Sequence, residues 1–278
     1  MSIKLVAIDM DGTLLDSVCK VPKENIKAIE KAIDNGVVVV PATGRCYRNT
    51  KNMITGAIPG ISYYVTCNGA IVVDDDKEEV IYEELMKKAD VKAVYELIEK
   101  YPVFTEIYAG LNSYVDARRT KHLYRSVLPT EYCDHLLKTV SEVADLKTIA
   151  DDPSISVSKF HIVGENSKDI EKLRNEINEV DGLHPISLIP ENIELTAGRW
   201  SKREGLKKLI AHLGIDREEV MVIGDSSNDY EMLEWAQYSV AMGNADEHAK
   251  ELADYITATN NEAGVARAIY EFGLAAEN

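Results

Sequence analysis

The chain has 278 residues, of which 45% are hydrophobic and 28% charged, with 31 Lys and Arg against 47 Asp and Glu. This composition is typical of a globular protein with a substantial core, and the length suits one large α/β domain or two smaller ones. The formal net charge of −16 argues against a nucleic-acid surface, which needs clustered Lys and Arg. An anionic small molecule can still bind where the site supplies its own cations and N–H donors.

The cysteines and apolar segments give no sign of secretion or of a membrane. Cys19, Cys46, Cys67 and Cys133 form no CxxC pair and no metal-finger spacing, so we expect free thiols. The apolar run Ile3–Ile8 is too short for a signal-peptide core, and no segment approaches the length of a membrane span. We therefore expect a soluble, cytoplasmic protein with no nucleic-acid or membrane partner.

Apolar runs and a helical pattern alternate near the start of the chain. Strands are expected at Ile3–Ile8, Val37–Val40 and Ser62–Thr66. Pro22 and Gly36 delimit a helix between the first two strands, since proline suits the first turn and glycine the residue after the last. A strand–helix–strand order predicts a parallel sheet covered by helices.

The same pattern returns near the other end of the chain. We expect a helix over Leu206–Leu213, strands at Val220–Ile223, Tyr238–Met242 and Tyr255–Ile256, and a last helix over Ala263–Phe272. These elements extend the parallel sheet begun by the first residues.

The middle of the chain has a different pattern. Helices are expected around Val91–Ile98 and Ile170–Ile177, with strands at Val103–Tyr108, Ser113–Val115, Ile155–Val163 and near Ile186–Ile189. Alternating strands indicate a separate α/β domain with an antiparallel sheet. We therefore expect a core formed by residues 1–84 and 190–278 and an inserted domain formed by residues 85–189.

The first chemically informative segment is Asp9-Met10-Asp11-Gly12-Thr13, directly after the first strand. Ligands of open α/β sheets bind beyond the carboxyl ends of the strands, and Gly12 permits the sharp turn that brings both carboxylates there. Carboxylates this close repel each other unless a cation lies between them, and Mg²⁺ prefers such oxygen ligands. An ordinary turn would also use Asp and Gly, but the position after the first strand favours function.

Two further segments suit a phosphate group. Thr43-Gly44-Arg45 follows the second strand, where a hydroxyl and backbone N–H groups can hold phosphate oxygens. Lys202 begins the helix over Leu206–Leu213, with Ser201 as a plausible N-cap. Either segment alone would be read as a plain loop or a surface lysine, and Arg199 and Arg203 are read as surface charges.

The fourth segment, Gly224-Asp225-Ser226-Ser227-Asn228-Asp229, follows the strand Val220–Ile223. Asp225 and Asp229 at the end of another parallel strand would complete a set of oxygen ligands for Mg²⁺. A single loop of this kind could be an Asx-rich turn, but two acidic loops after two buried strands favour a metal site.

Together these four segments resemble the signature motifs of the haloacid dehalogenase superfamily. Their order, and an insertion of about a hundred residues after the third strand, resemble the Cof-type phosphatases, which carry a type-IIB cap domain. Asn68-Gly69-Ala70 and Ala241-Met242-Gly243-Asn244-Ala245 are also similar to segments of that subfamily. The resemblance implies a Rossmann-like parallel-sheet core with an inserted α/β cap domain that governs substrate choice.

The resemblance also implies roles for single residues. Asp9 would be the nucleophile and Asp11 the general acid and base. Mg²⁺ would be bound by the carboxylates of Asp9 and Asp225 and the backbone carbonyl of Asp11, with Asp229 supporting a ligand or binding through water. The phosphoryl oxygens would be held by the N–H groups of Met10 and Gly44 and by Thr43 and Lys202, with Asn228 touching the phosphate or steadying Lys202. Ser226 departs from the glycine common at its position.

The expected activity is Mg²⁺-dependent hydrolysis of small phosphomonoesters through an aspartyl phosphate on Asp9. The leaving group is open among sugar phosphates, flavin mononucleotide and pyridoxal phosphate, with Tyr108, Asn112, Tyr114, Arg118, Arg119 and His122 as candidate contacts. Two alternatives are a phosphomutase of the same superfamily and a non-catalytic ligand-binding relative.

Overall fold

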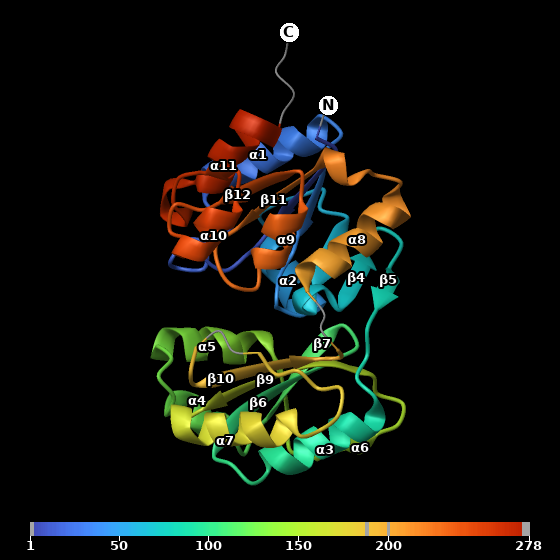
Figure 1. Ribbon diagram of the computed structural model, residues 1–278, viewed down its shortest axis with the longest axis vertical. Helices are drawn as coiled ribbons and strands as arrows, with labels where there is room; N and C mark the ends of the chain where they lie inside the picture. The colour runs from blue at the N-terminus through green and yellow to red at the C-terminus, as the bar shows by residue number, and fades with distance from the viewer. Residues whose placement is uncertain (1–2, 187–188, 199–200, 274–278) are drawn as a thin grey trace. The chain divides into compact units, whose positions relative to one another are not determined.

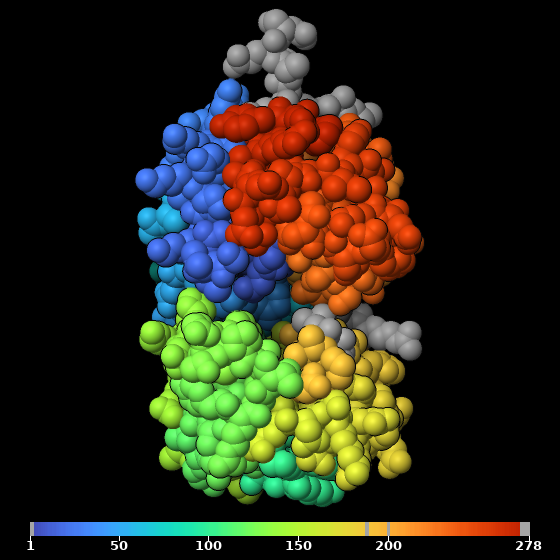
Figure 2. All heavy atoms as spheres, turned by 90° about the vertical axis from the view of Figure 1, so that its left-hand side faces the viewer, coloured from blue at the N-terminus to red at the C-terminus, as the bar shows by residue number. Residues whose placement is uncertain are grey.

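A computed structural model of the chain describes residues 3–186, 189–198 and 201–273. The chain divides into two compact units (Figure 1), the first formed by Met1–Glu83 and Ser201–Asn278 and the second by Glu84–Trp200. Figure 2 shows the N-terminal residues, in blue, packed beside the C-terminal residues, in orange and red, within the first unit.

The first unit is built on a five-stranded parallel sheet. Its order is β13 (Tyr255–Ile256), β12 (Tyr238–Ala241), β11 (Val220–Gly224), β1 (Leu5–Ile8) and β2 (Val38–Pro41). All residues of β1 and β11 are buried, as continuous apolar runs are when helices cover both faces of a parallel sheet. The carboxyl ends of β2, β1 and β11 lie side by side at one edge of the sheet.

Two layers of helices cover this sheet (Figure 1). On one side α1 (Lys23–Asp34) packs against α11 (Gly264–Ala268), which continues as a π-helical turn over Ile269–Gly273. The other layer consists of α8 (Lys202–Leu213), α9 (Tyr230–Trp235) and α10 (Glu247–Leu252). The mixed α/β fold with a parallel sheet expected from the sequence is therefore confirmed.

The strand expected at Ser62–Thr66 forms, but it does not join the parallel sheet, so that prediction is wrong. β3 (Tyr63–Thr66) pairs antiparallel with β4 (Ile71–Asp74), which pairs with β5 (Glu79–Glu83). The turn Cys67–Gly69 reverses the chain, because Cys67, Asn68 and Gly69 all adopt positive φ. A single parallel bridge between Ala42 and Val65 connects β3 to the end of β2. α2 (Tyr47–Ile54), which the sequence analysis missed, lies between β2 and β3.

The second unit contains a five-stranded, mainly antiparallel sheet. Its order is β10 (Asn192–Thr196), β9 (Val157–Gly164), β6 (Val103–Ala109), β7 (Asn112–Asp116) and β8 (Ser141–Val143). One face packs on α3 (Lys88–Ile98), α6 (Lys147–Asp151) and α7 (Ser167–Asn178) through a large apolar core. On the other face α4 (Thr120–Tyr124) and α5 (Thr130–Thr139) cover a smaller apolar cluster.

The last strand of the second unit differs from the sequence prediction. A strand was expected near Ile186–Ile189, of which residues 187–188 lie outside the described part of the chain, and Ile186 makes only an isolated bridge to Glu194. The strand itself is β10, whose alternating residues pair with β9. Residues 190–198 thus lie with the second unit, whereas the sequence analysis placed the border at residue 189.

In the described part of the chain, no helix is long and apolar enough to cross a membrane. The four cysteines are free, as expected, and three of them, Cys46, Cys67 and Cys133, are buried. The cytoplasmic location stays a prediction.

Candidate active site

The loop after β1 turns sharply at the sheet edge. Asp9 donates its N–H to the carbonyl of Ile223 on β11, and the Met10 carbonyl accepts the N–H groups of Thr13 and Leu15 at 3.3 and 2.9 Å. Gly12 has φ +86°, and a Cβ at this position would lie 2.5 Å from Asp225 Oδ2. This position therefore requires glycine for two reasons: the backbone is left-handed, and a side chain would clash with the Asp225 carboxylate.

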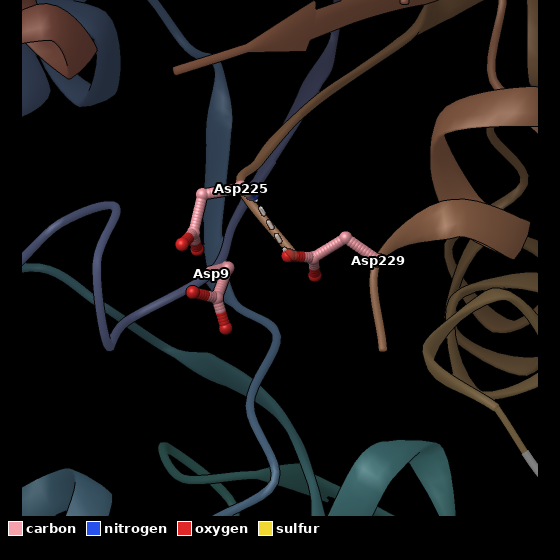
Figure 3. Close-up of side chains that lie close together, drawn as sticks. All are labelled: Asp9, Asp225 and Asp229. Atoms are coloured by element: carbon pink, nitrogen blue, oxygen red, sulfur yellow. Dashed lines mark hydrogen bonds between the residues drawn. The ribbon is translucent and has the colours of Figure 1, made fainter. Parts of the chain in front are cut away.

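Three carboxylates converge at the ends of β1 and β11 (Figure 3). One oxygen from each of Asp9, Asp225 and Asp229 lies within 4.8 Å of the others. Asp9 and Asp229 are buried, and Asp225 is partly buried. The parallel pairing of β1 with β11 places the first two side by side, because it sets Ile8 opposite Ile223.

Asp229 holds the β11 loop in shape. Its Oδ2 accepts the N–H groups of Asp225 at 2.9 Å and Ser226 at 3.2 Å, the first of which Figure 3 marks. A Cβ on Gly224 would lie 2.6 Å from the Asp229 carboxyl carbon, so glycine gives this carboxylate its space. The Thr13 hydroxyl donates to Asp225 Oδ1 at 2.9 Å and links the two acidic loops.

Lys202 is fully buried at the first turn of α8 and lies between two of the carboxylates. Its Nζ is 2.5 Å from Asp9 Oδ1 and 2.7 Å from Asp229 Oδ1. The helix start comes close to the turn after β3, since a Cβ on Gly69 would lie 2.2 Å from the Ser201 carbonyl oxygen. The lysine is therefore part of a buried charge network, in contrast to an ordinary surface lysine at a helix start.

The residues around Lys202 differ in part from the sequence predictions. Ser201 occupies the N-cap position, but its hydroxyl donates to Glu231 at 2.7 Å and does not cap the helix. Arg203 is half-buried and pairs with Glu204 and Glu231. Arg199 lies outside the described residues.

Burial and mutual repulsion raise the pKa of the clustered carboxyls. The pKa of Asp9 is raised well above its usual value, chiefly by burial, although Lys202 opposes the shift. Burial and the charge of Asp229 raise the pKa of Asp225 to about 6. Burial would lower the pKa of Lys202, but Asp229 and Asp9 outweigh it and the net shift is upward. One buried ammonium thus leaves the three carboxylates short of positive charge.

The residues at this edge fit a small divalent cation. Asp9 Oδ1 is bound by Lys202, whereas Asp9 Oδ2 is buried and no described donor reaches it. A buried carboxylate oxygen without a donor is costly, and a cation beside Asp225 would satisfy it. An all-oxygen donor set is the one that Mg²⁺ prefers.

Asp11 is not part of the buried cluster, and its carboxylate forms an ion pair with Arg45. Arg45 Nε and Nη2 each lie 2.7 Å from one oxygen of the Asp11 carboxylate, in a bidentate pair. The Asp11 side chain is 51% exposed. It is therefore the one motif carboxylate that solvent reaches readily, which suits a group that exchanges protons.

The expected phosphate-binding residues lie at the same edge, with one difference. Thr43 is buried after β2 and is tied by backbone hydrogen bonds to Val65 and Asn68. Its Oγ1 accepts the Arg45 N–H at 3.2 Å, so the turn also orients Gly44. Asn228 does not steady Lys202: its Oδ1 accepts from Ser226 at 3.0 Å, and Asp229 contacts the lysine instead.

Sequence reasoning missed two residues that support these loops. Arg45 was grouped with the phosphate turn, with no signal that it would pair with Asp11. Asn244 donates to the Gly12 carbonyl at 2.8 Å and accepts the Asn260 N–H at 2.8 Å, which ties the first loop to the C-terminal segment. The sequence of Ala241–Ala245 indicates only a similarity to a segment of the family.

The parallel sheet thus gathers a buried lysine and three carboxylates at the ends of its strands. A family model described as haloacid dehalogenase-like hydrolase matches residues 6–269. The chain therefore belongs to that family, as the motifs indicated, and it is a phosphoric monoester hydrolase.

Similar proteins and solved structures support the same family. The chain is 34% identical to a 5-amino-6-(5-phospho-D-ribitylamino)uracil phosphatase, YcsE, of Bacillus subtilis, over 99% of this chain and 97% of the relative. It is similar to a haloacid dehalogenase-like hydrolase structure from B. subtilis with TM-score 0.82, 28% identity and coverage of 96% and 99%. A subclass IIB sugar phosphatase of the superfamily aligns with TM-score 0.77 and 27% identity over 98% of this chain and all of that one.

Proposed function

We propose that the chain is a Mg²⁺-dependent phosphatase of small phosphomonoesters that forms an aspartyl phosphate on Asp9. One observation carries this proposal. Asp9 has one oxygen held by Lys202, while the other is buried and has no donor among the residues that the structure describes. A carboxylate fixed in this way is positioned as a nucleophile, because phosphoryl transfer depends mainly on positioning and on charge stabilisation.

Several groups would stabilise the charge on the phosphoryl oxygens. The Lys202 ammonium provides a fixed positive charge next to the nucleophile, and Asp229 keeps it in place. Thr43 and the N–H groups of Met10 and Gly44 would add donors at the same sheet edge, with Asn228 as a further contact. Fixed donors of this kind require no reorganisation as the charge develops.

Asp11 would carry the proton. Protonated, it donates to the leaving oxygen as Asp9 bonds to phosphorus; deprotonated, it then takes a proton from the water that cleaves the acyl phosphate. Its exposure supports this role, because solvent reaches the carboxylate and can exchange protons with it.

Asp9, Asp225 and the backbone carbonyl of Asp11 would hold the metal ion, with Asp229 fixing the loop that carries Asp225. When bound, Mg²⁺ supplies a positive charge that offsets the repulsion between these carboxylates and the phosphoryl group. The raised pKa values of Asp9 and Asp225 support this assignment, because they show a site short of positive charge.

We further propose that the second unit is the cap that sets substrate choice. The relatives named as phosphatases of a ribityl phosphate and of sugars support a small, hydroxyl-bearing ester. Of the candidate contacts, Arg118 pairs with Asp116 and Asp145, Arg119 with Glu99, and His122 with Glu165. These three side chains are used within the second unit's own structure. Tyr108, Asn112 and Tyr114 remain as candidate contacts to the leaving group.

A phosphomutase is the alternative, since it would use the same phosphoenzyme and return the phosphoryl group to a sugar. Hydrolysis without any sugar bisphosphate activator, measured as released inorganic phosphate, supports the phosphatase. An absolute requirement for such an activator would favour the mutase.

Removal of the metal tests the proposal directly. Chelation with EDTA should abolish hydrolysis of p-nitrophenyl phosphate, and added Mg²⁺ should restore it. Ca²⁺ should support turnover poorly, because its larger and looser shell misplaces the nucleophile. Mg²⁺ should also raise the melting temperature of the wild type but not of Asp225→Ala, by binding the folded state only. Full activity after exhaustive chelation would refute the metal assignment.

A further inference from the structure

The loop that follows β12 is fixed to the acidic loop after β11. The parallel pairing of β12 with β11 brings the two segments together at the same edge of the sheet. The Met242 N–H donates to the Gly224 carbonyl at 3.0 Å, and the Asp246 N–H donates to the Asp225 carbonyl at 3.0 Å. We call residues Met242–Asp246 the β12 loop. Both of its ends are therefore bound to the backbone around Asp225.

The middle of the β12 loop binds the other acidic loop, which follows β1. Asn244 Nδ2 donates to the Gly12 carbonyl at 2.8 Å, although the two residues lie 232 positions apart in the chain. Gly12 comes directly after Asp11, whose backbone carbonyl we propose as a metal ligand. It comes directly before Thr13, whose hydroxyl donates to Asp225 Oδ1 at 2.9 Å. A side chain that fixes the Gly12 peptide therefore restrains two groups beside the proposed metal position.

The carboxamide of Asn244 is itself held in one orientation. Its Oδ1 accepts the Asn260 N–H at 2.8 Å, and its Nδ2 is left to donate to Gly12. This assignment of oxygen and nitrogen follows from the partners, because an N–H needs an acceptor and a carbonyl needs a donor. The Asn260 side chain is buried and donates to the Leu15 carbonyl at 2.9 Å, again in the loop after β1. The two asparagines thus hold the same loop at two carbonyls.

The β12 loop has little room to shift. Ala245 donates its N–H to the Met242 carbonyl at 2.9 Å, which closes the loop into a turn. A Cβ on Gly243 would lie 3.0 Å from backbone atoms of residues 257–259, so the loop packs directly on the segment after β13. Close-packed groups cannot move independently of one another. The β12 loop therefore connects the two acidic loops as a stiff segment.

The separation of the two acidic loops matters for a small cation. Asp9 and Asp11 lie on one loop and Asp225 on the other, so their ligand atoms come from two separate segments. Mg²⁺ needs nearly octahedral ligands at about 2.0–2.1 Å and tolerates little error in their spacing. Groups that orient metal ligands without touching the metal typically change its affinity by about 10- to 100-fold when they are substituted.

We propose that Asn244 is a positioning residue for the metal site, which sets the separation of the acidic loops after β1 and β11 and so raises the affinity of the free protein for Mg²⁺. This inference rests on the proposed function for the identity of the ion, but its test measures binding and needs no turnover. Asn244 acts through the peptide of Gly12, so its loss weakens the site without removing a ligand.

Calorimetry with Mg²⁺ alone measures the effect directly. Asn244→Ala should bind Mg²⁺ about 10-fold more weakly than the wild type, at the lower end of the range for groups that orient metal ligands. Asn244→Leu, which fills nearly the same space but makes no hydrogen bond, should show the same loss. Agreement between the two variants assigns the effect to the hydrogen bonds and not to lost volume.

The Mg²⁺ dependence of hydrolysis separates positioning from a general structural role. For p-nitrophenyl phosphate, the Mg²⁺ concentration that gives half-maximal rate should rise about 10-fold in Asn244→Ala. At saturating Mg²⁺, kcat should return to within about 3-fold of the wild-type value, because all ligands are still present. A merely structural residue would instead lower kcat at every Mg²⁺ concentration, together with the melting temperature of the metal-free protein.

Asn261→Ala is the matched control. Asn261 is exposed in the 3₁₀ helix Asn260–Glu262, and its Oδ1 accepts the Ser17 N–H at 3.0 Å. It therefore also binds the loop after β1, but five residues beyond Gly12. Its loss should change the affinity for Mg²⁺ by no more than about 2-fold, since it orients no proposed ligand.

The outcomes distinguish this inference from the proposed function. Unchanged Mg²⁺ affinity in folded Asn244→Ala, or an equal loss in Asn261→Ala, would overturn the inference while the proposed function would stand. A kcat that stays low in Asn244→Ala at saturating Mg²⁺ would also overturn it. A wild type that binds no Mg²⁺ would overturn the metal assignment itself, and the inference with it.

Discussion

Asp9→Asn is expected to abolish turnover, with kcat lowered at least about 10⁴-fold for every phosphomonoester, because it removes the proposed nucleophile. The amide oxygen can still accept the Lys202 hydrogen bond that now holds Oδ1. The substitution also removes one of three crowded carboxylates, so the free energy of unfolding should stay the same or rise. Initial rates with p-nitrophenyl phosphate and a urea unfolding curve measure both quantities.

Asp34→Asn is the matched control for the loss of one carboxylate. Asp34 is exposed at the end of α1, and Asp34→Asn should leave both rate and stability close to wild type. If Asp9→Asn retained more than about 1% of wild-type kcat, attack by Asp9 could not be the route of hydrolysis.

Lys202→Met is expected to have the largest effect on stability. The side chain is fully buried and binds Asp9 and Asp229, which would be left close together without a cation between them. Removing one partner of a buried ion pair typically lowers the free energy of unfolding by about 3–5 kcal/mol, since the remaining charge is desolvated and unpaired. Urea unfolding in the absence of Mg²⁺ measures this loss directly. Activity should also fall by about 10²- to 10³-fold, the effect of one missing oxyanion donor.

Lys207 on the same helix is the control for Lys202. It is 42% exposed and pairs with Glu204, so Lys207→Met should cost no more than about 1 kcal/mol. If Lys202→Met were as stable as Lys207→Met, the two carboxylates would not depend on the lysine, and the charge network inferred for the site would be wrong.

The position of Asp9 beside Asp225 at one edge of the sheet could be predicted from the sequence, because both residues follow short, strongly apolar strands. Ile8 and Ile223 end two fully buried runs, and parallel pairing of such strands leaves Asp9 and Asp225 few other places to lie. Lys202 was predicted from the start of a helix and from family resemblance. Its depth could not be read from the chain, because burial depends on the close approach of Gly69 to Ser201.

The rest depended on contacts that no local pattern records. Positive φ at Asn68 turned β3 away from the parallel sheet, although its residues read like any buried strand. The burial of three charged residues of the second sheet could not be predicted, because Glu106, Lys159 and Glu194 look like solvent-facing residues of alternating strands. Only the register of three strands brings them together, and only the fold shows that they are buried. The ion pair between Arg45 and Asp11 could not be predicted either, because it depends on the geometry of the turn after β2.

The central claim, an aspartyl phosphate on Asp9, is tested most directly by trapping it in Asp11→Asn. This variant keeps the nucleophile but cannot activate water, and p-nitrophenolate leaves with little need of a proton. Reaction with p-nitrophenyl phosphate should therefore give a burst of nitrophenolate and a protein about 80 Da heavier, with the added mass located on Asp9 by peptide mass spectrometry. An adduct on Asp11 in the Asp9→Asn variant, or turnover by Asp11→Asn with no adduct on Asp9, would contradict the account.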